Sequence, residues 1–366
     1  MKKSVKIGVM VFIAMLGMSK LTYAQGGSAV PFLLISPDAR ASGMGEVGTA
    51  IADDINAIYW NPGGLGFLDY FEGSYEDQFD PDAELAPFRQ VALSYSPWLP
   101  QFNADLNYGN FSAGQFFESI DGTVAFNFIL MDLGKFTQTD INGIEEGTFN
   151  SQEFAVGLSY GTIIAPNLGA GLQLRYIQSN LTPTSEAATK PGTGRSVSFD
   201  IGLLWKPIDL WVFEDRLSLG FNLQNVGPKI TYISEADPLP TNLRLGIAYN
   251  AYEDEFNELL VAFDVAKLLV NRDELGSDPI PLSLISAWQN PGVELSAGVE
   301  YWYQQIVSFR GGFFFEPSDL GNRQFWNLGM GIRYDIFKLD FGYILTVEAN
   351  NPLANTMRFS MLVDLE

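Results

Sequence analysis

The sequence predicts an all-β protein: a 14-stranded antiparallel transmembrane β-barrel with an N-terminal hatch segment in its lumen. From residue 88 onward, apolar and polar residues alternate with period 2 in segments of about ten residues, as in barrel strands. The connections between these segments are alternately short and long. The chain also begins with an export signal.

The export signal occupies residues 1–24. Three lysines within the first six residues are followed by the apolar residues 7–18, and residues 22–24 (TYA) form a cleavage site. This pattern is typical of a secretory signal peptide, and an N-terminal anchor helix is the alternative. No later segment contains 18 consecutive apolar residues, so the sequence excludes a transmembrane helix.

The amino-acid composition excludes several classes of catalytic and metal site and disfavours nucleic-acid binding. The chain has no cysteine and no histidine, which excludes a cysteine nucleophile, a histidine-assisted triad and ordinary zinc sites. Four of the 21 basic residues lie in the signal peptide, which leaves 17 basic against 43 acidic residues and a net charge of −26. A chain this acidic is a poor candidate for binding nucleic acid.

Fourteen segments have strand periodicity. In residues 168–176, for example, Leu168, Leu172 and Leu174 alternate with glycine, glutamine and arginine. Each such segment has one apolar and one polar or small face. The predicted strands span 88–96, 101–110, 121–134, 151–160, 166–179, 195–206, 216–226, 241–250, 257–266, 292–303, 305–315, 323–334, 336–345 and 355–365.

The lengths of the connections indicate how the barrel is oriented in the outer membrane. If the first strand runs outward, the even-numbered connections are short periplasmic turns, and the long odd-numbered ones are extracellular loops. The long ones include 135–150, 180–194, 227–240 and 267–291. A soluble β-sandwich is the alternative fold, but the strand ends carry the aromatic residues typical of a barrel girdle: Tyr160, Tyr176, Trp205, Tyr249, Tyr301, Tyr303 and Tyr334.

Residues 25–87 do not alternate and are rich in Gly, Ala and Pro, with room for a short helix within 37–57. We therefore divide the chain into a signal peptide (1–24), a hatch (25–87) and a transmembrane barrel (88–366). The polar strand faces carry charged and amide side chains such as Arg175, Asn222 and Glu300, which favours a water-filled or hatch-filled lumen.

The hatch carries a motif, IADDINAIYWNPGGLGFL at 51–68, that resembles the hatch of FadL-type outer-membrane transporters. Its proline and paired glycines predict a hard bend after the aromatic pair. The acids either bind a cation, sit beside a lumenal arginine, or are simply solvated. The motif residues are Asp53, Asp54, Tyr59, Trp60, Asn61, Pro62 and Gly63.

Three further stretches, at 27–48, 293–303 and 352–364, resemble the PorV (LptO) family of the type IX secretion system, a FadL-related family of barrels. The resemblance implies a non-enzymatic protein of the Gram-negative outer membrane. It would carry secreted proteins, held by their C-terminal domains, from a large translocon barrel to a cell-surface sortase or attachment complex. FadL-like uptake of fatty acids or other hydrophobic small molecules is the alternative, and lipid A deacylation is a third possibility.

No catalytic, cofactor or metal site emerges. The acidic pairs Glu145/Glu146 and Glu253/Glu255 fall in expected loops or turns, and no buried nucleophile with a base accompanies them. Loop 267–291 does contain an unexpected apolar run, PLSLISAW, which either folds back on the barrel rim or contacts a protein partner. Its candidate partner-binding residues are Leu282, Leu284, Ile285 and Trp288.

Overall fold

The structure is a computed structural model. It describes residues 27–69, 87–102, 105–139, 142–182, 192–207, 213, 215–233, 235–273, 276–289, 292–318, 320–348 and 351–365. The predicted signal peptide lies outside the described residues. No helix within these ranges is long and apolar enough to cross a membrane.

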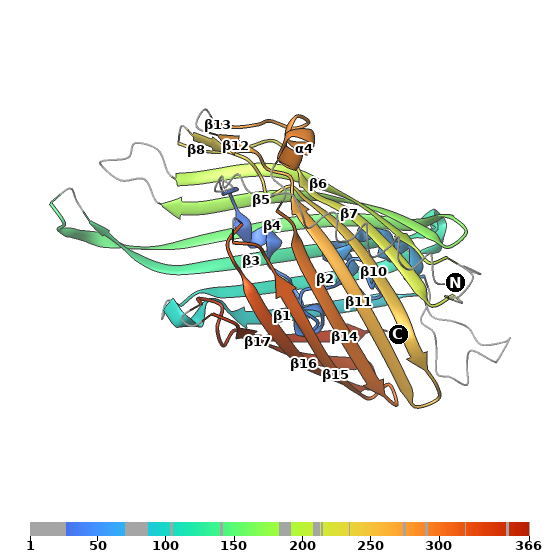
Figure 1. Ribbon diagram of the computed structural model, residues 1–366. Coiled ribbons are helices and arrows are strands. Elements are labelled where there is room, and N and C mark those ends of the chain that lie inside the picture. The colour runs from blue at the N-terminus through green and yellow to red at the C-terminus, as the bar shows by residue number, and fades with distance from the viewer. Residues whose placement is uncertain are drawn as a thin grey trace.

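Among the described residues, fourteen antiparallel strands close into one barrel, so the predicted fold is confirmed (Figure 1). Closure joins the first strand to the last, with Gln90 opposite Asp364 and Tyr95 opposite Phe359. The barrel strands are β1 (Arg89–Pro97), β2 (Asn107–Phe117), β3 (Gly122–Thr139), β4 (Glu145–Ala165), β5 (Leu168–Thr182), β6 (Gly192–Trp205), β7 (Leu217–Val226), β10 (Asn242–Glu253), β11 (Asn257–Leu268), β14 (Glu294–Tyr303), β15 (Val307–Phe315), β16 (Gln324–Tyr334), β17 (Phe337–Thr346) and β18 (Met357–Asp364).

The wall of the barrel follows the alternation in the sequence. On β5, Leu172 and Leu174 are 58% and 64% exposed on the outer face, whereas Gln173 and Arg175 are buried on the inner face. Because successive side chains of a strand point to opposite faces, the register between strands decides which side chains face outward and which face the lumen. The outer surface is therefore apolar and the lumen is polar.

The two ends of the barrel differ. At one end, here called the turn end, consecutive strands are joined by short links at 118–121, 166–167, 254–256, 304–306 and 335–336. Several of these links place residues in the left-handed region, as two-residue hairpin turns require. The other end, the loop end, carries the longer connections, with a small sheet of β8 (Ile230–Tyr232) and β9 (Glu235–Asp237) and another of β12 (Arg272–Asp273) and β13 (Gly276–Ser277).

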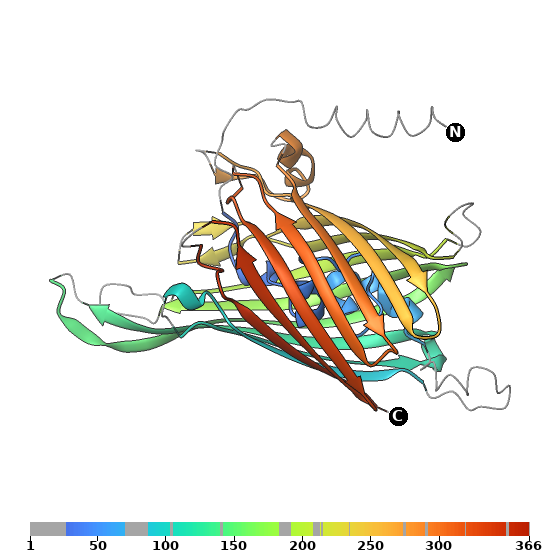
Figure 2. The same cartoon turned by 60° about the horizontal axis from the view of Figure 1, so that its bottom comes forward.

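The predicted boundaries of the second, third and fourth strands are wrong. The second strand begins at Asn107 instead of 101, because Pro100–Phe102 forms the short helix η4 and the Trp98 N–H bonds to the Leu106 carbonyl at 2.8 Å. The predicted loop 135–150 is largely a continuation of β3 and β4, in which Phe136 stacks on Phe149 with ring centroids 5.7 Å apart. The β3–β4 hairpin consequently extends beyond its neighbours at the loop end (Figure 2).

The hatch runs through the lumen as short helices joined by tight turns (Figures 1 and 2). Asp38 caps α2 by accepting a 2.7 Å hydrogen bond from the Ala41 N–H. One half of the hatch packs on β15–β18 through α2, and the other half packs on β3–β6 through η2. Its helices are η1 (Pro31–Leu34), α2 (Ala39–Gly43), α3 (Ala57–Trp60) and η2 (Pro62–Phe67), and η5 (Glu118–Ile120) lies in the β2–β3 link.

Candidate functional site

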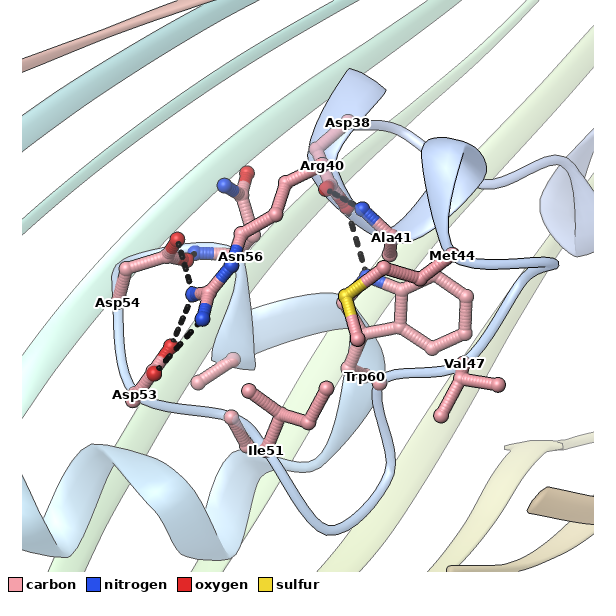
Figure 3. Close-up of a pocket in the computed structure, with 13 residues that line it drawn as sticks. Asp38, Arg40, Ala41, Met44, Val47, Ile51, Asp53, Asp54, Asn56 and Trp60 are labelled. Atoms are coloured by element: carbon pink, nitrogen blue, oxygen red, sulfur yellow. Dashed lines mark hydrogen bonds and ion pairs between the residues drawn. The ribbon is translucent and has the colours of Figure 1, made fainter. Parts of the chain in front are cut away.

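The aromatic pair of the hatch motif is buried inside the barrel. Tyr59 and Trp60 are 3% and 4% exposed and meet edge to face with ring centroids 5.1 Å apart. The Trp60 indole N–H donates to Asp38 at 2.7 Å (Figure 3). The Arg244 guanidinium lies 4.7 Å from the centroid of the Trp60 ring. The indole therefore ties α3 to both the start of α2 and the barrel wall.

Asn61 fixes the bend that follows. Its side-chain amide donates to the Thr49 carbonyl at 2.8 Å and the Leu203 carbonyl at 2.9 Å, and its side-chain oxygen accepts from the Gly63 N–H at 3.0 Å. Pro62 begins η2 immediately afterwards. Because Asn61 is completely buried, these three bonds satisfy backbone groups that water does not reach.

Glycines let the hatch backbone touch the wall directly. A Cβ on Gly63 would lie 2.7 Å from the Leu204 nitrogen, and one on Gly312 of β15 would overlap the Met44 backbone. Gly45 also needs glycine for its backbone, since its φ is +76°. The hatch is thus held by close packing along its length.

The motif acids lie beside an arginine that the sequence analysis did not single out. Arg40 donates to Asp53 at 3.1 Å and lies 3.7 Å from Asp54 (Figure 3). It also donates to Glu300 of β14 at 2.7 Å. Glu300 also accepts from Arg310. The sequence could have indicated this partner, because Arg40 is the only basic residue in the acidic segment 25–87.

This arrangement moves the pKa values of the two acids in opposite directions. Burial raises the pKa of Asp53, but Arg40 outweighs it and the pKa falls below its usual value. Burial, together with the neighbouring Asp53 charge, raises the pKa of Asp54 to about 6. Among the described residues, no group of three or more His, Cys, Asp or Glu side chains could hold a metal ion.

A cavity of about 480 Å³ lies between the hatch and the loop end. Its walls include Phe32 and Ile35 of the hatch region, Met131 of β3 and the stacked pair Phe314 and Phe325. Its volume is within the range of small-molecule pockets, and its lining combines apolar side chains with a few charged ones. The sequence did not predict this cavity, because its walls come from segments far apart in the chain.

The apolar run of the loop 267–291 forms a small knob at the loop end, built from α4 (Ser283–Ser286) and η6 (Ala287–Gln289). Leu282, Ile285 and Trp288 are 52%, 76% and 56% exposed, while Leu284 is half-buried. The helices bury only small side chains, Ser283, Ser286 and Ala287. Three of the four large apolar residues of the knob are therefore exposed.

The family of the chain can now be stated. A family model described as "Type IX secretion system protein PorV" matches residues 24–274, more than half of the chain. The chain belongs to the PorV family. No curated protein matches it in sequence.

Solved structures show which fold this PorV family member shares. The CymD monoaromatic hydrocarbon channel aligns with a TM-score of 0.53 at 12% identity, over 91% of this chain and 98% of that one. The toluene transporter TbuX of Ralstonia pickettii gives 0.51 at 12% identity (91% and 98%), and TodX of Pseudomonas putida gives 0.51 at 13% (90% and 98%). At these identities the likeness shows the barrel fold.

Proposed function

We propose that this PorV family member is a non-enzymatic carrier of type IX secretion in the outer membrane of a Gram-negative bacterium. It would take secreted proteins, through their C-terminal domains, from the large translocon barrel to the cell-surface sortase or attachment complex. Family membership supports the secretion system. The geometry that supports a carrier is a barrel fixed in outer-membrane lipids with an exposed apolar surface at its loop end.

The observation that carries the proposal is the apolar knob formed by Leu282, Ile285 and Trp288. A helix packed for stability buries its large apolar residues, whereas here the small ones are buried and the large ones are exposed. Hydrogen bonds hold the knob in place, since Asp278 accepts from Ser286 and from Asn271 at 2.5 and 2.9 Å. Ordered aromatic and aliphatic side chains of this kind anchor protein interfaces.

Charge substitution in the knob tests this role. Ile285→Glu combined with Trp288→Glu should lower the amount of cargo attached to the cell surface by about tenfold or more, since interface anchors typically contribute over 1 kcal/mol each. Ile306→Glu is the matched control, because Ile306 is 49% exposed in a turn-end link. Normal cargo display by the knob variant, at unchanged barrel abundance, would exclude the knob as the docking surface.

A second candidate function is passage of a hydrophobic small molecule. It is favoured by the 480 Å³ cavity and by the fold shared with hydrocarbon and toluene channels. The hatch argues against free passage, because its backbone contacts the wall along its length. Saturable flux of a hydrophobic compound into vesicles containing the purified barrel would promote this function above the carrier.

A further inference from the structure

The charged side chains around the 480 Å³ cavity are almost all paired. Three arginines line it: Arg244, Arg323 and Arg358. Arg244 pairs with Asp264 at 3.4 Å and Arg358 with Glu46 at 3.0 Å. Each arginine also lies over an aromatic ring, 4.7 to 5.5 Å from its centroid. Their charge and their position are therefore fixed by the protein itself.

Two of the cavity's carboxylates are neutralised in the same way. Arg323 binds Glu294 at 3.0 Å and Glu316 at 2.7 Å. With Glu46 held by Arg358, three of the four lining glutamates face a guanidinium. An anionic ligand entering the cavity would therefore meet guanidinium groups whose charge is already balanced by carboxylates, and it would compete with those carboxylates.

The fourth glutamate is different. Glu153 of β4 lines the cavity, is only 6% exposed and accepts a 2.7 Å hydrogen bond from the Ser179 hydroxyl. Within the described part of the chain it has no cationic partner within 4 Å, since no ion pair includes it. A buried carboxylate without a counter-ion is costly, and it gains most from a ligand that brings the missing charge.

Apart from the Ser179 hydroxyl, the side of Glu153 that faces β3 and the hatch is apolar. Met131 lies directly opposite it on β3, and Met131 packs in a buried cluster with Phe32 and Leu106. These three side chains also line the cavity. A ligand whose charged end reaches Glu153 would therefore place its remaining surface against hydrocarbon.

We propose that the cavity binds an amphiphile with an apolar body and a cationic head, and that Glu153 pairs with that head. The geometry disfavours a carboxylate head, so the site would reject a fatty acid anion and accept an amine of the same size. This inference goes beyond the carrier role and stands independently of it, because it concerns binding to the purified barrel alone.

Three probes that differ only at the head test the proposal: 2-phenylethylammonium, 2-phenylethanol and 3-phenylpropionate. Each is titrated at neutral pH into the full barrel in lipid nanodiscs, with calorimetry and the fluorescence of Trp60 and Trp98, which line the cavity, as readouts. We expect the amine to bind about tenfold or more tightly than the other two, as a charge-assisted hydrogen bond implies.

Glu153→Gln should remove this preference while retaining the hydrogen bond to Ser179. Glu253→Gln, in an exposed position at the turn end, is the matched control for net charge and should keep the preference. Saturable binding of the acid or alcohol as tight as that of the amine would overturn the proposal, as would no saturable binding of any probe. The comparison on the unaltered protein decides the matter even if the Glu153 variant does not fold.

Discussion

At the residue scale, Asn61 connects the two halves of the hatch to the wall. Its side-chain amide donates to the carbonyls of Thr49 and Leu203, and its side-chain oxygen accepts from the Gly63 N–H. Asn61→Ala removes these three hydrogen bonds from buried backbone groups, and each bond contributes about 0.5–1.5 kcal/mol. We expect the thermal midpoint in detergent to fall by several degrees, measured from the heat-modifiable band in unboiled gels. Gln289→Ala, on the exposed knob, should leave the midpoint unchanged.

The acids Asp53 and Asp54 should respond to pH with opposite signs. The raised pKa of Asp54, about 6, means that its favourable contribution exists below about pH 4 and is lost as pH rises through 6. The lowered pKa of Asp53 means that its contribution is present above pH 4 and is lost as pH falls.

Substitution separates the two effects. At pH 8, Asp54→Asn should raise the thermal midpoint of the detergent-solubilised barrel and Asp53→Asn should lower it. At pH 4 the gain from Asp54→Asn should shrink, because the native carboxyl is then protonated. Shifts of the same sign for both variants at pH 8 would contradict the arrangement around Arg40.

At the element scale, adjacent glycines on β15 face opposite sides of the wall. Gly312 faces the hatch, where a side chain would overlap Met44, whereas Gly311 has no atom within 4 Å of an added Cβ. Gly312→Val should therefore push α2 off the wall and open a leak, seen as higher conductance in planar bilayers. Gly311→Val is the control and should stay closed. Equal conductance for the two variants would mean that the hatch does not seal by contact with β15.

The sequence predicted some elements better than others. Alternation identified the barrel strands, because one apolar and one polar face is a direct consequence of lipid outside and polar groups inside. Alternation did not predict the continuation of β3 and β4 beyond the barrel. In that stretch the two strands pair with each other, and Phe136 stacks on Phe149. Alternation also missed β8 and β9, since strands of three residues carry no measurable period.

The same limit applies to the site. The hatch motif and the apolar knob are each formed by one continuous segment, so the residue pattern of that segment was enough to predict them. The Arg40–Glu300 pair spans 260 residues, and the charges around the 480 Å³ cavity come from the hatch and from strands on different sides of the barrel. Which charges neutralise one another depends on register and closure, and neither can be read from one segment.

At the scale of the whole molecule, the barrel combines three separate parts. The apolar outer wall faces lipid, the hatch packs closely against the wall inside the lumen, and the knob at the loop end is the proposed docking surface. None of these parts requires catalytic chemistry. A carrier built this way should be found in complexes and should not act as an independent pore.

Affinity purification of the tagged barrel from its native outer membrane, with identification of the proteins that accompany it, tests this claim most directly. A carrier should be recovered with a very large translocon barrel, or with secreted proteins that retain their C-terminal domains, and both should be lost with the Ile285→Glu, Trp288→Glu variant. A barrel that always purifies alone would contradict it, if deleting the gene leaves secretion intact but abolishes growth on a hydrophobic nutrient.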